Sequence, residues 1–120
     1  MKNKILIIAG ISGALAVMLG ALGAHALQSV ISPEQLKSFQ TGNDYHIYHS
    51  LALLIVASLK ETFGPKNTKI IIYLFLSGII LFSGSIYMLA LKDLLGIASW
   101  KTILGPSTPI GGLLLISGWI

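Results

Sequence analysis

The three histidines are the residues of this chain best suited to chemistry, because imidazole binds metal ions, carries protons and forms hydrogen bonds near neutral pH. His46 and His49 are three residues apart, so on a helix they project from neighbouring positions of one face. Other polar side chains are expected at the same depth once the helices are assembled. Together they predict one ligand-binding site: His25, Tyr45, His46, His49, Ser50, Tyr87 and Thr108.

Two interpretations of this cluster stay open. In the first, it is a polar site that binds a small ligand, a lipid headgroup or a protein partner, that relays a proton, or that binds a divalent metal through His25, His46 and His49. In the second, the histidines only hydrogen-bond between helices and to interfacial water. Zinc takes at least three protein ligands even at catalytic sites, and the spacing does not show that three imidazoles converge. We therefore predict no metal and no cofactor.

The composition argues against most soluble functions. Of the 120 residues, 54% are hydrophobic and 10% are charged, and there is no cysteine. Soluble domains use about 25% charged residues, so this chain has too few charges to cover a soluble globule. The net charge of +4 comes from scattered lysines, unlike the concentrated basic patch that nucleic acid requires. No serine lies in a nucleophile motif, so we expect neither an enzyme nor a nucleic-acid partner.

Long uncharged stretches instead predict an all-α bundle of helices in the lipid bilayer. We expect one domain over residues 1–120, with spans at about 5–27, 45–63, 70–91 and 106–120. A span needs about 20 residues, so the fourth either begins before Pro106 and Pro109, or the chain ends partway through the membrane. The first stretch could instead be a signal peptide cleaved after Ala26, but it exceeds the 7–15 apolar residues typical of one.

Capping and turn signals separate these spans. Ser32, Pro33 and Gln35 predict the start of a short amphipathic helix on the membrane surface, and a solvated loop is the alternative. Gly42-Asn43-Asp44 predicts the end of that helix and the cap of the next. Gly64-Pro65 predicts a turn before the third span, and Pro109 suits the first turn of the fourth helix.

Lysines near the spans predict the orientation, because cytoplasmic loops carry an excess of positive charge. One side holds five lysines and the other holds three: Lys2, Lys4, Lys60, Lys66 and Lys69, against Lys37, Lys92 and Lys101. We therefore expect a cell-membrane protein with a cytoplasmic N-terminus and the histidine cluster at the outer face. Trp100 and Trp119 are expected to be interface anchors.

Small residues indicate where helices pack closely in lipid. The predicted packing positions are Gly13, Ala16, Gly20, Gly23, Gly78 and Gly84. The first helix carries a second small face at Gly10, Ala14 and Ala21. We therefore expect this helix to be central, either within the bundle or against another copy in a homo-oligomer.

Several phrases, taken in order, resemble a known family. They are GALGAH at 20–25, QTG at 40–42, YHIYHSLAL at 45–53, GSIY at 84–87, TPIGG at 108–112 and GW at 118–119. The sequence is similar, from about Ile5 to Ile120, to small bacterial membrane proteins classed as domain of unknown function 423 and to animal transmembrane protein 256. The resemblance implies a four-helix protein of the bacterial plasma membrane, with no established activity or cofactor. Family members usually continue past the Gly-Trp pair, which leaves the length of the fourth span open.

Overall fold

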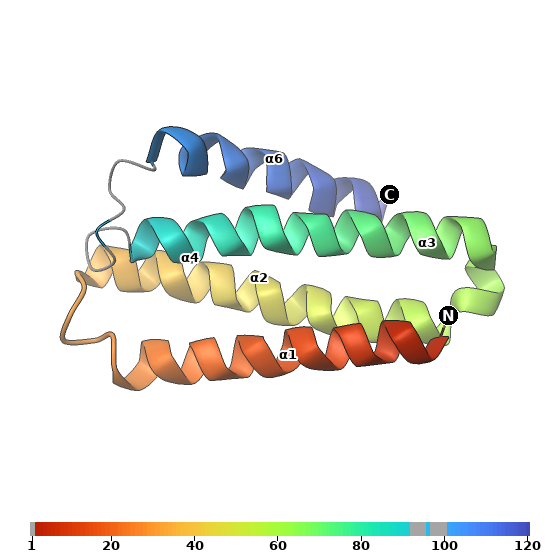
Figure 1. Cartoon of the computed structure of the whole chain (residues 1–120), viewed down its shortest axis with the longest axis horizontal. Helices are drawn as coiled ribbons and strands as arrows, with labels where there is room; N and C mark the ends of the chain where they lie inside the picture. The colour runs from red at the N-terminus through yellow and green to blue at the C-terminus, as the bar shows by residue number, and fades with distance from the viewer. Residues whose placement is uncertain (1, 92–95, 97–100) are drawn as a thin grey trace.

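Antiparallel helices build the described part of this computed structural model, which comprises residues 2–91, 96 and 101–120 and contains no strand within them. α3 (Lys60–Gly78), η1 (Ile79–Gly84) and α4 (Ser85–Ala90) follow one another without an intervening loop, and η1 is a π-helical segment. In Figure 1, α2 lies between α1 and the stretch from α3 to α4, and α6 lies on the side of that stretch away from α2. The elements are α1 (Lys2–His25), α2 (Pro33–Ser58), α3 (Lys60–Gly78), η1 (Ile79–Gly84), α4 (Ser85–Ala90) and α6 (Lys101–Trp119).

Helices α1 and α2 pack along a seam of small residues. Buried positions of α1 recur three, four or seven residues apart, the spacing of a left-handed helix pair: Ile5, Ala9, Ser12, Ala16 and Gly23. A Cβ atom on Gly20 would lie 2.8 Å from the Asn43 side chain, and one on Gly23 would lie 3.0 Å from the Phe39 ring. The structure thus places the predicted packing positions of α1 against α2.

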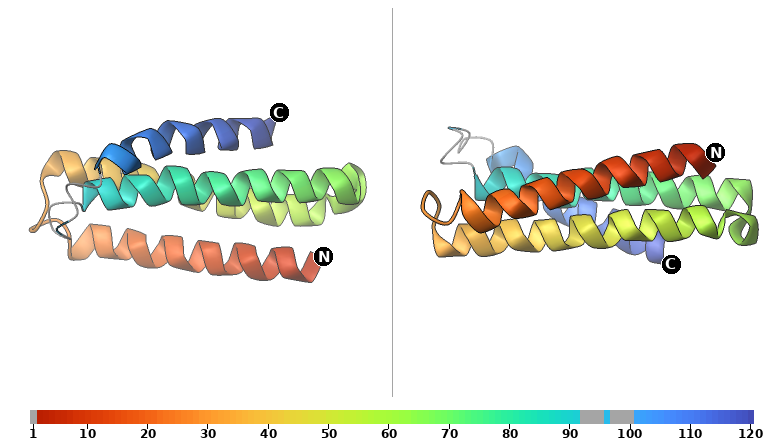
Figure 2. Two further views of the ribbon diagram at one scale, coloured as in Figure 1. Left: turned by 45° about the horizontal axis from the view of Figure 1, so that its top comes forward. Right: turned by 90° about the horizontal axis from the view of Figure 1, so that it is seen from below.

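The central helix is α2, and the prediction that α1 is central within the bundle is wrong. α2 contacts α1, α3, η1 and α4, whereas α1 packs chiefly on α2 (Figure 2). The second small face of α1 is exposed at Gly10, Ala14 and Ala21. Small residues show that a helix tolerates close approach, but they do not say whether a neighbour is present. Packing of this face against a second copy stays a prediction.

The predicted surface helix is wrong as a separate element, because α2 runs without a break from Pro33 to Ser58. Its start is confirmed: Ser32 Oγ accepts from the Gln35 backbone N–H at 3.1 Å, and the Gln35 side chain accepts from the Ser32 N–H at 3.0 Å. Gly42 does not end the helix. A Cβ atom there would lie 2.8 Å from the Ile86 side chain of α4, so this glycine permits close packing.

The second and third spans are also displaced from their predicted bounds. α2 ends at Ser58, and α3 begins at Lys60. The predicted turn at Gly64-Pro65 is confirmed, since Gly64 has φ 83° and ψ 161°, a conformation that glycine adopts without the cost of a Cβ atom. Helical structure then continues to Ala90.

The fourth helix begins before its prolines. α6 starts at Lys101, so Pro106 and Pro109 lie inside it, and the prediction of Pro109 in the first turn is wrong. Its 19 residues are about 28 Å long, which is close to the thickness of the hydrocarbon core. The predictions for Lys92 and Trp100 fall outside the described residues.

Glycines allow α6 to pack closely against α3 and η1. A Cβ atom on Gly78 would lie 2.5 Å from the Leu115 side chain, and one on Gly111 would meet the backbone of Phe82 in η1. Gly84, in contrast, has no atom within 4 Å of its Cβ position. Its predicted packing role is therefore wrong, whereas that of Gly78 agrees with the structure.

Two helical stretches are long and apolar enough to cross a membrane. They are Asn3–His25, with 23 residues, and Lys60–Ala90, with 31, and most residues of their most apolar windows are not buried inside the protein. The N-terminus lies at the same end of the bundle as the turn between α2 and α3 (Figure 1). The segments that carry the five predicted cytoplasmic lysines therefore share one end.

Candidate functional site

A network of hydrogen bonds joins α1, α2 and α4 halfway along the bundle. His46 lies at its centre, with Nδ1 2.9 Å from the Tyr87 hydroxyl and Nε2 3.1 Å from Ser12 Oγ. Ser12 Oγ lies 2.6 Å from Ser50 Oγ, and Asn43 Nδ2 donates to the Tyr87 hydroxyl at 3.2 Å. We refer to these five residues as the polar network. All but Tyr87, which is partly exposed, are buried.

The donors in the polar network can be assigned one after another. The Ser50 hydroxyl donates to the His46 carbonyl oxygen at 2.8 Å, so Ser12 must be the donor in the serine pair. Because Ser12 has used its only hydrogen, His46 Nε2–H donates to Ser12 Oγ. The bare Nδ1 of His46 then accepts from the Tyr87 hydroxyl. The network is thus fully satisfied by a neutral imidazole protonated on Nε2.

His49 has a separate set of partners. Its Nδ1 lies 2.7 Å from the Tyr45 carbonyl oxygen, which only accepts, so Nδ1 carries the hydrogen. Its Nε2 accepts from Trp119 Nε1–H at 3.0 Å, and the Phe75 ring packs edge-on with centroids 5.3 Å apart. The Tyr45 carbonyl therefore places the hydrogen of His49 on Nδ1, and the indole of α6 donates to the bare Nε2.

We expect the two buried histidines to be opposite tautomers. In protein labelled with 15N-histidine, NMR spectra should show the hydrogen of His46 on Nε2 and that of His49 on Nδ1. Trp119→Phe should shift the signal of His49 Nε2, which loses its hydrogen-bond donor, while the Nδ1 hydrogen of His49 and the His46 signals stay in place. Finding the same tautomer at both positions would contradict the donor assignment.

The structure does not bring the three histidines together. His25 is exposed at the end of α1, 13 residues beyond Ser12, which corresponds to about 20 Å along the helix. His46 and His49 lie in the middle of α2 rather than at its start, because the helix begins at Pro33. The predictions of one common site and of its place at the outer start of the second span are therefore wrong.

The remaining predicted site residues divide between the two clusters and the α4–α6 contact. Ser50 and Tyr87 belong to the polar network with His46. Tyr45 contributes its carbonyl to His49, and its own ring stacks on Phe82 with centroids 5.1 Å apart. The Thr108 hydroxyl bonds to that of Ser85, which joins α6 to α4. Within the described residues, no group of three or more His, Cys, Asp or Glu side chains could hold a metal ion.

Sequence reasoning missed Ser12 and Asn43. Asn43 was assigned to a helix end, but its side chain donates to the Ala16 carbonyl oxygen of α1 at 2.7 Å. The spacing contained a signal: Asn43, His46 and Ser50 are three and four residues apart, and such residues share one face of a helix. Ser12 is a hydroxyl within the apolar α1, where a buried hydroxyl requires a partner.

A groove lies beside the polar network, between α1 and the stretch from α3 to α4. Its volume is about 660 Å³, and its wall is mostly aliphatic, with Ser12, His46, Ser83 and Tyr87 as polar members. Ser83 is 1% exposed, and its hydroxyl has no hydrogen-bond partner within the described part of the chain. We call this cavity the α1–η1 groove. It combines an apolar lining with a few polar groups, as small-molecule sites do.

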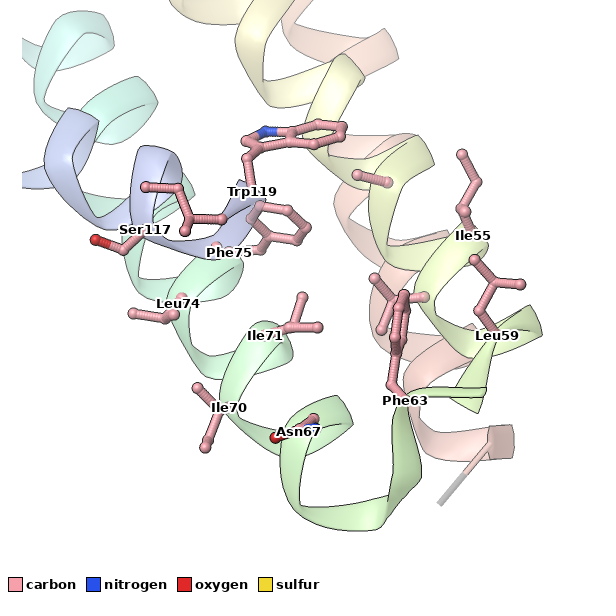
Figure 3. A pocket seen from close by; sticks show the side chains of 14 residues that line it. Ile55, Leu59, Phe63, Asn67, Ile70, Ile71, Leu74, Phe75, Ser117 and Trp119 are labelled. Carbon is pink, nitrogen blue, oxygen red and sulfur yellow. The ribbon is translucent and has the colours of Figure 1, made fainter. Parts of the chain in front are cut away.

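A second cavity lies at the opposite side of α2. It has a volume of about 590 Å³ and is bounded by α2, α3 and the end of α6. Figure 3 shows Phe63 and Trp119 on two of its sides, with Asn67 as a polar side chain among aliphatic ones. Since Trp119 contacts His49, this cavity adjoins the second histidine and not the polar network.

Long apolar helices around a buried polar network are typical of helical membrane proteins, and the relatives of this chain are named as membrane proteins. The chain belongs to the family described as "Protein of unknown function (DUF423)", whose model matches residues 19–112. Among its relatives is the UPF0382 membrane protein YwdK of Bacillus subtilis, 41% identical over 98% of this chain and 91% of that protein. The resemblance to this family is thereby confirmed.

Relatives extend beyond one bacterial group. A UPF0382 membrane protein of Haemophilus influenzae is 38% identical over 100% of this chain and 90% of its own. The UPF0382 membrane protein C1782.12c of Schizosaccharomyces pombe is 44% identical over 93% of this chain and 92% of its own. No solved structure matches the chain.

Proposed function

We propose that α1, α2, the α3–η1–α4 stretch and α6 each cross the cell membrane, with the N-terminus in the cytoplasm. The 26 residues of α2 are about 39 Å long, which is sufficient for a crossing. Its polar residues make α2 less hydrophobic than α1, but Asn43, His46 and Ser50 are buried against neighbouring helices. The shared lysine-rich end supports the orientation, because positive residues favour the cytoplasmic side.

We propose further that the protein binds a lipid-soluble molecule with one neutral polar group in the α1–η1 groove. The carrying observation is the Ser83 hydroxyl, which is buried in the wall of the groove without a partner. An unmade hydrogen bond in such surroundings costs about 1–3 kcal/mol. A ligand whose hydroxyl or carbonyl reaches Ser83 recovers part of that cost, and its apolar body covers the aliphatic wall.

The proposed activity is binding rather than catalysis. The polar network beside the groove is neutral, and its histidine uses both ring nitrogens in hydrogen bonds. A general base or a metal ligand needs a nitrogen lone pair that is free for substrate or ion. Metal handling is the alternative drawn from the sequence, and it required three imidazoles at one place. His25 lies at the end of α1, far along that helix from Ser12, the residue that bonds His46.

Labelling with a photoreactive long-chain alcohol tests this proposal. The probe is a 16-carbon primary alcohol with a diazirine in its chain, added to protein in phosphatidylcholine nanodiscs. We expect crosslinks in α1 and η1 that excess hexadecanol removes. Ser83→Ala should weaken the competition by about fivefold, the equivalent of one hydrogen bond of about 1 kcal/mol.

A matched pair of tryptophan variants controls for labelling from bulk lipid. Ile80 lines the groove and is 68% exposed, whereas Ile116 on α6 is 57% exposed and lines neither cavity described above. Ile80→Trp should fill the groove and abolish labelling, and Ile116→Trp should leave it intact. Equal labelling of both variants, or crosslinks spread evenly over the outer faces of the helices, would overturn the proposal.

A further inference from the structure

A third cavity, at the interface of α1 and α3, lies at the lysine-rich end of the bundle. Its volume is about 380 Å³, and Lys4 and Lys69 line it together with an apolar wall of Ile5, Ile8, Ile72 and Leu76. We call it the basic cleft. It shares Ile8 and Leu76 with the α1–η1 groove, so the two cavities follow each other along α1. The basic cleft nevertheless has its own polar groups.

Among the residues that the structure describes, the two lysines of the basic cleft have no acidic partner. Both side chains are exposed, and the ion pair found within the described residues joins Lys60 to Glu61, with Nζ 3.6 Å from Oε1. Lys69 Nζ lies over the ring of Tyr73, 5.9 Å from its centroid. A ring face attracts a cation but does not neutralise it, so the cleft presents two uncompensated positive charges.

The wall below these charges is the surface that a hydrocarbon chain would cover. Tyr73, which also lines the cleft, is 61% exposed, and Ile8 is 37% exposed. Both α1 and α3 belong to the stretches that are apolar enough to cross a membrane. Two cations above an apolar wall at the end of a membrane helix pair complement an anionic headgroup with an attached acyl chain, and basic pockets between membrane helices bind such headgroups.

We propose that the basic cleft binds an anionic phospholipid, with the phosphate between Lys4 and Lys69 and one acyl chain against Ile8 and Leu76. The apolar wall favours a lipid over free phosphate, because a free anion would leave that wall uncovered. The single negative charge of a phosphatidylglycerol headgroup suffices for the contact. This site adjoins the one proposed at Ser83 through Ile8 and Leu76, but its phosphate contacts are its own, so neither proposal requires the other.

Native mass spectrometry of the full chain released from detergent tests this site. Dioleoyl phosphatidylglycerol and dioleoyl phosphatidylcholine are titrated separately, and inorganic phosphate is added to each as a competitor. We expect one molecule of phosphatidylglycerol to bind more tightly than phosphatidylcholine, and phosphate not to compete. Each lysine near an anionic lipid contributes enough for about a fivefold change in affinity. Lys4→Gln and Lys69→Gln should each weaken binding about fivefold, and the double variant about 25-fold.

Lys66→Gln is the matched control, because Lys66 is an exposed lysine of α3 outside the cleft. It should bind phosphatidylglycerol as the wild type does, and circular dichroism should show equal helicity for all variants. Equal binding of the two lipids, competition by phosphate, or an equal loss in Lys66→Gln would each overturn the proposal. Ser83→Ala should leave this affinity unchanged, so failure of one site is distinguishable from failure of the other.

Discussion

Gly111→Ala is expected to lower the free energy of unfolding by about 3 kcal/mol, the upper end of the cost of overpacking. The added Cβ atom would lie 2.7 Å from the carbonyl carbon of Leu81 and 2.8 Å from Cα of Phe82. Backbone atoms cannot rotate away as a side chain does, so α6 would have to move off η1. Thermal unfolding of the detergent-solubilised protein, followed by circular dichroism, measures the loss.

The neighbouring glycine provides the control. A Cβ atom on Gly112 would lie 3.5 Å from the Phe82 ring, which is ordinary contact, and one on Gly105 would meet nothing within 4 Å. Gly112→Ala should therefore be nearly neutral, and Gly105→Ala neutral or stabilising by up to about 1 kcal/mol. If Gly111→Ala unfolds at the same temperature as Gly112→Ala, the close approach of α6 to η1 is wrong.

His46→Leu is expected to lower the free energy of unfolding by about 2–3 kcal/mol. The substitution removes two side-chain hydrogen bonds and leaves the Tyr87 hydroxyl and Ser12 Oγ with fewer partners. An interhelical hydrogen bond in a membrane contributes about 0.6–2 kcal/mol, and the two act within one connected network. The same unfolding measurement detects the effect.

A double-mutant cycle separates the network from a general loss of packing. Tyr87→Phe combined with His46→Leu should show a coupling energy of about 1 kcal/mol, because each variant removes the same hydrogen bond. His25→Leu is the matched histidine control, since His25 is exposed at the end of α1, and it should change stability little. Additive effects of the two network variants would contradict the observed contact.

The sequence predicted the helices better than their ends. Long apolar stretches are sufficient to predict the helical class, because a buried backbone in lipid must satisfy its own hydrogen bonds. The cap at Ser32 and the break at Gly64 were also predictable, since each depends on residues next to one another in the chain. Both are present in the structure.

The position of the site was not predictable, because it depends on contacts between helices. Gly42 and Asn43 have the composition of a turn, and that interpretation placed His46 at the start of a helix. In the structure, Gly42 packs against Ile86 of α4, and the Asn43 side chain donates a hydrogen bond to α1. Local propensity cannot distinguish a residue that ends a helix from one that a neighbouring helix requires.

The π-helical turn of η1 sets the rotational phase of everything that follows it. A π-bulge widens one turn of a helix to accommodate an additional residue, and one residue corresponds to about 100° of rotation in an α-helix. The geometry of residues 79–84 therefore determines how α4 is rotated about its axis. That rotation sets the direction in which the Tyr87 phenol points. A change of chain length within that turn would swing the phenol away from the imidazole while every residue of the polar network stayed the same.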